Sequence, residues 1–164
     1  MLLLLFKIGQ GHFAIAASQV RKVIPRVALT GIADAPEYTA GLLNFRGAFV
    51  PVIDLCRLAT GKSAALRISS RIILVDYTLT DDQSAILGLL AEDVVETVRS
   101  KEPLLPSVVI NLNDLSDRPA TLLRENDVIQ MFDLHRMLPA REVDTLFTHF
   151  QQAQDSDHPE FDQA

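Results

Sequence analysis

The sequence is poor in cysteine. Cys56 is the only cysteine among 164 residues, so the chain cannot form an internal disulfide bond. The histidines have no Cys, Asp or Glu partner at the spacing of a metal site or a catalytic triad; they are His12, His135, His149 and His158. We therefore expect no metal, no cofactor and a cytoplasmic protein.

Basic residues and long apolar runs are scarce as well. The chain has 15 Lys and Arg against 21 Asp and Glu, which gives a net charge of −6. This balance argues against a nucleic-acid partner, which needs clustered positive charge. No segment approaches the roughly 20 apolar residues of a membrane helix. The leucine run at the start has no positive charge before it, unlike a secretory signal, and predicts a first strand.

Apolar residues are abundant, at 48% of the chain, and part of their pattern is duplicated. The stretch "VIDLCRLA" at residues 52–59 recurs as "MFDLHRML" at 131–138. In both copies a strand-like run ends at an aspartate, Asp54 or Asp133, that is suited to cap a short helix. Upstream, Gly47 and Asn126 occupy equivalent positions, and both residue types accept the positive φ of a turn.

These patterns predict an all-β fold with short helices. A second matched pair, residues 13–24 and 87–98, strengthens the interpretation as two small β units. Apolar residues at helical spacing in 141–150 predict a C-terminal helix that packs on the body. Residues 1–152 are then one domain, and the acidic segment 153–164 is predicted to be a flexible tail.

One pattern suggests an enzyme. "GQGHFA" has Gly9, Gly11 and Ala14 in G-x-G-x-x-A spacing, with Asp34 downstream, as in a nucleotide-binding loop. The segment that should form the following helix is rich in β-branched residues and ends in Pro25. The alternative interpretation of "GQG" is a hairpin turn. Nothing else in the sequence resembles a convergent catalytic set, and this absence favours a binding module over an enzyme.

The segment "APEYTAGLLNFRGAFVPVIDLCRLATG", preceded by "QVRKVIP", resembles the signature region of the CheW-like family, the adaptor proteins of bacterial chemosensory arrays. The resemblance covers residues 1 to about 139 and is most specific through residues 19–58. The motif positions that match are Pro36, Tyr38, Gly41, Asn44, Arg46, Gly47, Pro51, Asp54 and Leu55.

The resemblance implies two SH3-like, five-stranded β-barrels around a shared core, and no enzymatic activity. Members of the family join the CheW-like regulatory domain of a chemotaxis-type histidine kinase to the cytoplasmic hairpin tip of chemoreceptors, where an apolar groove would hold a receptor helix. By resemblance, the receptor-binding positions are Val20, Lys22, Gly41, Arg46, Ile72 and Ile73. The kinase-binding positions are Leu89, Val94 and Val98.

Each of these positions has a structural alternative. The valines, isoleucines and leucine among them fit a hydrophobic core equally well. Gly47, Asp54, Asn126 and Asp133 are expected to serve turns and caps. Arg46 either reaches a partner or holds loop carbonyls through its five donors. A further alternative for the whole chain is self-assembly through exposed strand edges.

Three departures from the family pattern bear on partner choice. Lys22 stands where the family frequently has Glu, which reverses the sign of a contact at the rim of the groove. Phe45 replaces the usual Leu before Arg46. The segment 108–117 lacks a glycine that often precedes the last hairpin. These departures favour an accessory chemosensory pathway, for example one controlling surface behaviour or motility.

Overall fold

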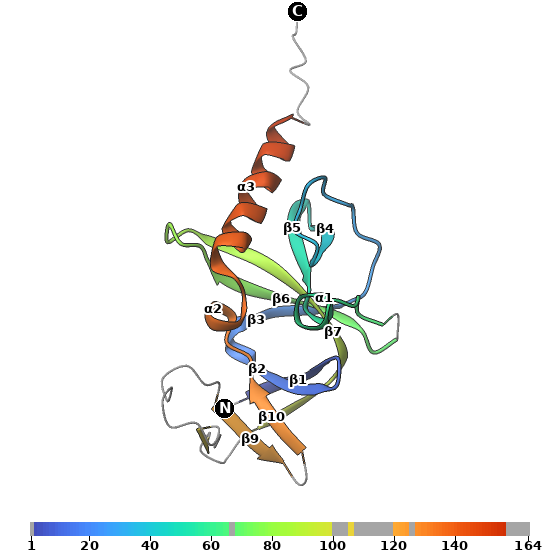
Figure 1. Ribbon diagram of the computed structural model, residues 1–164, viewed down its shortest axis with the longest axis vertical. Helices are drawn as coiled ribbons and strands as arrows, with labels where there is room; N and C mark the ends of the chain where they lie inside the picture. Colours follow the sequence, from blue (N-terminus) through green and yellow to red (C-terminus); the bar gives the residue numbers. More distant parts are fainter. Residues whose placement is uncertain (1, 66–67, 100–104, 107–119, 125–126, 157–164) are drawn as a thin grey trace, which may run out of the picture.

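A computed structural model describes residues 2–65, 68–99, 105–106, 120–124 and 127–156. The first half contains β1 (Leu2–Ile8), β2 (Gly11–Ala16), the 3-10 turn η1 (Ala17–Gln19), β3 (Val20–Pro25), β4 (Thr39–Phe45), β5 (Ala48–Asp54) and α1 (Leu55–Thr60). The second half contains β6 (Arg71–Thr78), β7 (Ser84–Arg99), β8 (Leu105–Pro106), β9 (Ala120–Arg124), β10 (Asp127–Met131), α2 (Leu134–Met137) and α3 (Ala140–Ser156). The expected all-β fold with short helices and a C-terminal helix is confirmed (Figure 1).

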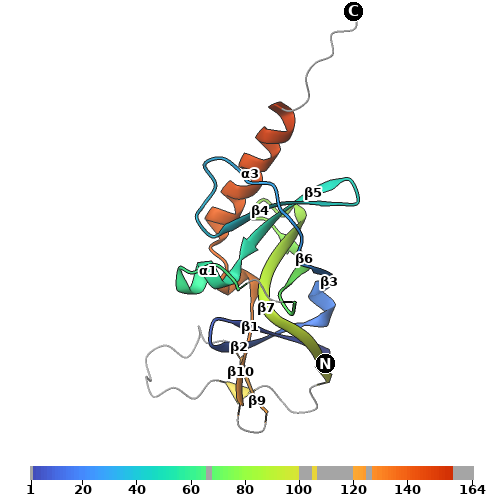
Figure 2. The same ribbon diagram turned by 90° about the vertical axis from the view of Figure 1, so that its right-hand side faces the viewer.

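The strands form two groups that share β7. In the first group β6 lies between β3 and β7, and β7 also pairs with β5, which pairs with β4. In the second group the order is β7, β1, β2, β10, β9 and β8. Figures 1 and 2 show the second group at one end of the molecule and β4, β5 and α3 toward the other.

The two halves of the chain exchange strands in equivalent ways. β5, from the first half, pairs in parallel with β7, and Val52 lies opposite Gly88. β10, from the second half, pairs in parallel with β2, and Met131 lies opposite Ala14. Val52 and Met131 are equivalent in the sequence repeat, as are Gly88 and Ala14. Each half therefore completes the strand group begun by the other, and this exchange follows the predicted sequence repeat.

β7 is a single 16-residue strand that passes from one group to the other. At Asp93 its backbone has a φ of +47°, and the ladder with β1 shifts register nearby, between Leu5 and Lys7. Such a bulge increases the local twist and redirects a strand. Ser69 donates to the Asp93 carboxylate at 2.7 Å, and Lys7 pairs with it at 3.3 Å. These contacts fix the point at which β7 changes sheet.

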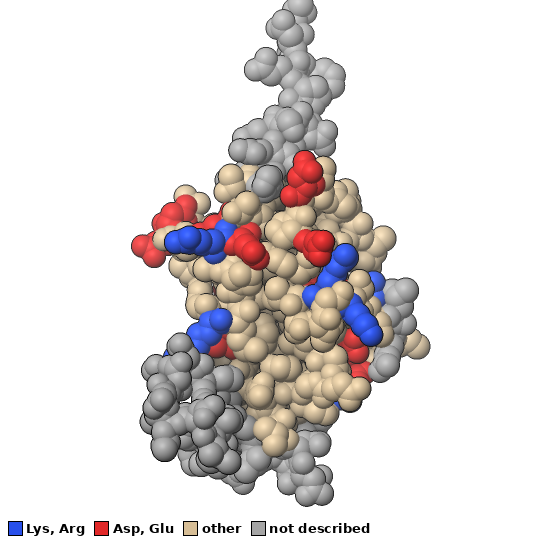
Figure 3. Space-filling model, in the orientation of Figure 1, with Lys and Arg blue, Asp and Glu red and all other residues tan. Residues whose placement is uncertain are grey.

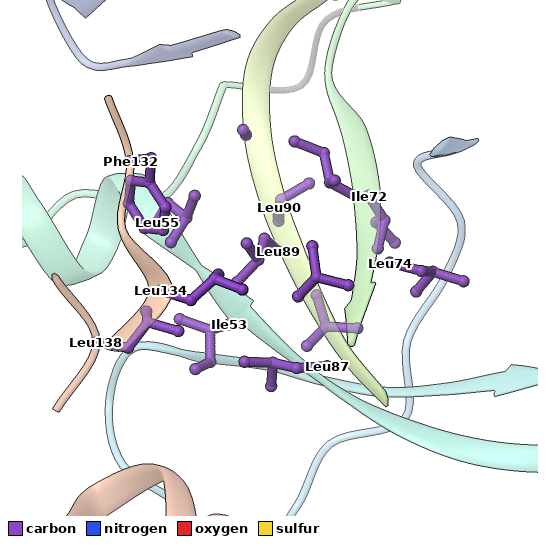
Figure 4. Packing of buried hydrophobic residues seen from close by; sticks show 14 of the residues in the cluster. Ile53, Leu55, Ile72, Leu74, Leu87, Leu89, Leu90, Phe132, Leu134 and Leu138 are labelled. Atoms are coloured by element: carbon purple, nitrogen blue, oxygen red, sulfur yellow. The ribbon is translucent and has the colours of Figure 1, made fainter. Parts of the chain in front are cut away.

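The core lies between the strand groups and the short helices. In Figure 4 the side chains of Leu134, the first residue of α2, and of Leu138, which follows α2, point toward Ile53 of β5 and Leu89 of β7. All four are buried. Burying a side chain of this size contributes about 1.5–3 kcal/mol, so the packing of α2 onto β5 and β7 ties the two halves of the chain together.

The predicted caps of both short helices are present. Asp54 accepts a hydrogen bond from the Arg57 amide at 3.1 Å, at the start of α1. Asp133 accepts from the amides of His135 and Arg136 at 3.0 and 3.3 Å, at the start of α2. Both aspartates therefore satisfy backbone donors that the first helical turn leaves free.

α3 covers β5 and is longer than predicted. Its apolar stripe is buried, as expected, through Val143, Leu146, Phe147 and Phe150. The ring of Phe150 lies 6.3 Å from that of Phe49 on β5. The helix continues to Ser156 and so includes the first four residues of the expected tail. Residues 151–154 are Gln, Gln, Ala and Gln, which contain no helix-stopping Gly or Pro. Residues 157–164 lie outside the described part of the chain.

Candidate functional site

The turn between β4 and β5 is a two-residue hairpin loop formed by Arg46 and Gly47. Their φ angles are +54° and +83°, and Phe45 pairs with Ala48 on either side of them. The amide of Gly47 donates to the Asn44 side-chain oxygen at 3.1 Å. Two positive φ angles in such a loop define a type I′ turn, which glycine and asparagine favour. Gly47 serves the turn as predicted. Arg46, in contrast, adopts a positive φ that is unfavourable for a residue with a side chain.

Two cations converge on the ring of Phe45. The Arg46 guanidinium carbon lies 5.1 Å from the ring centroid, and the Lys22 ammonium, which comes from β3, lies 5.6 Å from it. At an exposed site each such cation–π contact contributes about 0.5–1 kcal/mol. We call Lys22, Phe45 and Arg46 the basic aromatic site. From the sequence, Phe45 was interpreted only as a bulkier replacement for leucine, and its contact with the two cations was missed. The signal that could have indicated this contact is an aromatic residue next to the arginine of a predicted turn.

The charge of the basic aromatic site is not neutralised within the described chain. Lys22 and Arg46 are both exposed, and neither forms an ion pair with a described carboxylate. Arg21, the neighbour of Lys22, differs because it pairs with Asp76 at 2.6 Å. Two adjacent positive charges on a chain of net charge −6 favour an external group with negative charge.

Two other predicted receptor-binding residues lie nearby in sequence but differ in role. Val20 begins β3 and is half-buried. Gly41 is buried, with a φ of +143°, and a Cβ there would meet the Thr30 carbonyl oxygen at 2.7 Å and the Leu29 side chain at 2.8 Å. Gly41 therefore permits the chain between β3 and β4 to lie against β4, and it has no side chain to offer a partner.

The remaining predicted binding residues are parts of the core. Ile72, Ile73 and Leu89 are 0% exposed and Val94 is 5% exposed. Ile72 and Ile73 pair with Ile24 and Val23 of β3, so they support the strand that carries Lys22. In this structure the side chains of these four residues therefore belong to the hydrophobic core, which was the alternative to a binding role. They do not join the basic aromatic site as surface residues.

Val98 and Asn126 complete the set of predicted residues. Val98 is half-buried and packs with Leu3, Ala14 and Ile129, in a small cluster of the second strand group. It lies on the second half of β7, away from the turn at Arg46. Asn126 lies outside the described residues.

The structure contradicts the nucleotide-binding interpretation of "GQGHFA". Gly9, with a φ of +59°, lies in the tight turn between β1 and β2. Gly11 begins β2, which runs antiparallel to β1 with Ile8 opposite Gly11. A dinucleotide site needs a helix N-terminus after this loop, and a strand occupies that place. The β-branched residues after the loop form β2 and β3, so the hairpin alternative is correct.

Cys56 is buried beside a carboxylate. It is 2% exposed, and its thiol donates to a carboxylate oxygen of Glu92 at 3.3 Å. Burial, together with the nearby charge of Glu92, raises the pKa of the Cys56 thiol to about 12. A thiol in this environment stays protonated and is a poor nucleophile.

Two features are absent from the described part of the chain. No group of three or more His, Cys, Asp or Glu side chains in these ranges is arranged to hold a metal ion. Among the helices that the structure describes, none has both the length and the apolar character required to cross a membrane.

Comparison with known proteins agrees with this architecture. The family model described as "CheW-like domain" matches residues 2–142. The chain is 25% identical over 142 residues to "Chemotaxis protein CheW" of Rhizobium meliloti (strain 1021), which covers 85% of this chain and 88% of that protein. It is 26% identical over 136 residues to "Chemotaxis protein CheW" of Helicobacter pylori (strain ATCC 700392 / 26695), and this match covers 76% of this chain and 79% of that protein.

A solved structure shares the fold. The scaffolding protein TtCheW from Thermoanaerobacter tengcongensis superimposes with a TM-score of 0.67 and 23% sequence identity, covering 83% of this chain and 86% of that one. The family match includes both strand groups, the basic aromatic site and the start of α3. The chain therefore belongs to the CheW-like domain family.

Proposed function

We propose that this chain is a non-enzymatic adaptor that couples chemoreceptors to a chemotaxis-type histidine kinase. The observation that carries the proposal is the basic aromatic site, which holds Arg46 of the family motif and Lys22 exposed over one ring. Membership of the CheW-like family supplies the partner classes. The protein acts without a cofactor by holding two partners in fixed geometry, and it works in the cytoplasm beside membrane-bound receptors.

The receptor-binding surface is proposed around β3 and the β4–β5 turn. Val20, Lys22 and Arg46 contribute side chains to it, and the apolar face of a receptor hairpin helix would lie along it. Gly41, Ile72 and Ile73 act indirectly, because they are buried and hold β3 and β4 in place. Charged groups at the rim of such a contact set register and partner choice.

The strain at Arg46 supports a recognition role. A non-glycine residue in the left-handed region costs roughly 1–2 kcal/mol, and Asn at this position of a type I′ turn would avoid most of that cost. Strained residues that persist are concentrated at functional sites. The turn points the guanidinium onto Phe45, at 5.1 Å, which fixes a side chain that is otherwise flexible.

The kinase-binding surface is proposed along the second half of β7. Leu89 and Val94 are buried and would shape this strand, while Val98 retains some exposed surface. The receptor and kinase surfaces then lie on different strand groups that β7 joins. We further infer from Lys22 that the chain serves an accessory chemosensory pathway, for example one controlling surface behaviour or motility.

Capture of partners by Arg46→Ala tests the receptor surface. Ala tolerates positive φ no better than Arg, so the turn keeps its strain while the guanidinium is removed. We expect wild type to retain the cytoplasmic hairpin of the host's chemoreceptors and Arg46→Ala to retain much less, with kinase capture unchanged. Arg141→Ala, which removes an exposed arginine of α3, is the control for net charge. Wild type that captures neither partner class refutes the proposal.

A further inference from the structure

A second polar site lies on the first strand group, between the chain that follows β3, the start of β4 and α1. The structure has a cleft of about 690 Å³ here. Its lining includes Arg26, Leu29, Thr39, Asp54, Arg57 and Ile68. In Figure 3 Lys and Arg side chains, with Asp and Glu side chains beside them, lie on the right-hand side of the face, where α1 and the chain between β3 and β4 lie in Figure 1. The cleft is separate from the basic aromatic site, because it shares none of its residues.

Two hydrogen-bond donors of this cleft are buried without a partner. The Nη1 atom of Arg26 and the hydroxyl oxygen of Thr39 are both inaccessible, and neither has a hydrogen-bond partner among the described residues. Buried polar atoms are nearly always paired in folded proteins, since an unsatisfied donor loses its hydration without compensation. Two such donors in one cleft indicate that a group with acceptor oxygens completes the site.

The carboxylate of the cleft does not fill this role. Asp54 uses one oxygen to accept from the Arg57 amide at 3.1 Å and the other to accept from the Ala64 amide at 2.9 Å. Neither Arg26 nor Arg57 forms an ion pair with a carboxylate in the described ranges. The lining therefore contains two arginines and one engaged aspartate, which leaves a net positive charge.

We propose that this cleft binds an oxyanion, a carboxylate or a phosphate group, through Arg26, Thr39 and Arg57. A guanidinium presents several N–H donors in a planar fork that matches both oxyanions. The Thr39 hydroxyl adds a donor at the start of β4. The site is independent of the adaptor role, because a chain that captured no receptor would still present the same donors.

The apolar rim of the cleft allows a carboxylate of a protein side chain to be distinguished from free phosphate. Val27 and Ile68, which line the cleft, are 45% and 91% exposed. In a bound peptide, the residues next to the one that carries the carboxylate would cover these two side chains. Inorganic phosphate has no such residues and would leave the side chains exposed. A short apolar peptide with a central aspartate therefore binds more tightly than phosphate if the natural occupant is a protein side chain.

Calorimetric titration of the full chain tests the site with two probes, inorganic phosphate and acetyl-Leu-Asp-Leu-amide. We expect saturable binding of at least one probe, weakened about tenfold or more in Arg26→Gln because a hydrogen bond to a charged group is lost. Thr39→Val keeps the shape of the side chain and removes its hydroxyl, so it should also weaken binding. Arg141→Gln, with the same change of net charge on α3, should bind as wild type does.

If neither probe binds saturably, or if Arg26→Gln and Arg141→Gln bind equally well, the oxyanion site is refuted. Thr39→Val also gives a readout that does not depend on Arg26. Without a probe its thermal midpoint should equal or exceed that of wild type, because an unsatisfied hydroxyl has been removed. A lower midpoint together with unchanged probe binding would contradict the proposal.

Discussion

Ile73 of β6 and Leu89 of β7 lie directly opposite each other in the antiparallel ladder, and both side chains are 0% exposed. The family resemblance places them on different surfaces, one facing the receptor and the other the kinase. In this structure they are neighbours in one core. A substitution at either position therefore acts first on stability, and an effect on partner capture follows from the altered support of β3 and β7.

A double-mutant cycle tests this relationship. We expect Ile73→Ala and Leu89→Ala each to lower the free energy of unfolding by about 2–5 kcal/mol, as buried large-to-small substitutions do. Because the side chains are adjacent, their effects should depart from additivity by at least about 0.5 kcal/mol. Urea unfolding followed by circular dichroism measures both quantities.

The control pair for this cycle is Ile73→Ala with Leu3→Ala. Leu3 is also fully buried but belongs to the smaller cluster in the second strand group, so the two effects should add. Loss of partner capture by Ile73→Ala at unchanged stability would show instead that this side chain reaches a partner.

Arg46→Asn should affect stability and capture in opposite directions. Asn accepts the positive φ of the turn, which relieves part of a strain of roughly 1–2 kcal/mol. It also removes repulsion from Lys22. The lost cation–π contact with Phe45 offsets about 0.5–1 kcal/mol of that gain. We expect the free energy of unfolding to stay equal or rise by up to about 1 kcal/mol, while receptor capture falls. A fall in both would identify Arg46 as a structural residue.

Cys56 should react slowly in the folded protein. Its thiol has a pKa of about 12 in place of 9.0, so at pH 8 the reactive thiolate is about a thousandfold scarcer than in the unfolded chain. Alkylation by iodoacetamide, followed by mass spectrometry with and without urea, measures this protection. Rapid labelling of the folded chain would contradict the buried geometry.

The same shift makes stability depend on pH. Because the folded-state pKa lies above the unfolded value, the stabilisation from keeping the thiol protonated is complete below pH 9 and declines as pH rises toward 12. Cys56→Ala should have a flatter stability profile than wild type above pH 9, because the two tyrosines contribute equally to both proteins. Parallel profiles for the two proteins would contradict the assignment of this shift to Cys56.

Local signals in the sequence were sufficient for the strands, turns and caps. Apolar runs between turn residues predicted the strands, Asp54 and Asp133 predicted the caps, and the stripe of α3 was correctly placed. These features depend on residues close in sequence, so their physics can be inferred from a short window. The predicted end of this helix is too early, because acidic composition does not by itself end a helix.

Long-range features were harder to predict. The sequence repeat indicated two units but did not reveal that β5 joins β7 and β10 joins β2. Burial on both faces also hid the status of Ile72 and Ile73, since an apolar strand residue fits a core and a binding groove equally well. The basic aromatic site arises from β3 and the β4–β5 turn, which are 24 positions apart at Lys22 and Arg46. Such convergence becomes visible only once the strands are placed.

The most direct test of the adaptor function is a three-component capture experiment. The cytoplasmic hairpin of a host chemoreceptor is immobilised, the chemotaxis-type kinase is added, and the retained kinase is measured with and without this chain. We predict that kinase is retained only when the chain is present, and that Arg46→Asn lowers the amount. Kinase retention that is equal with and without the chain would contradict the proposed adaptor function.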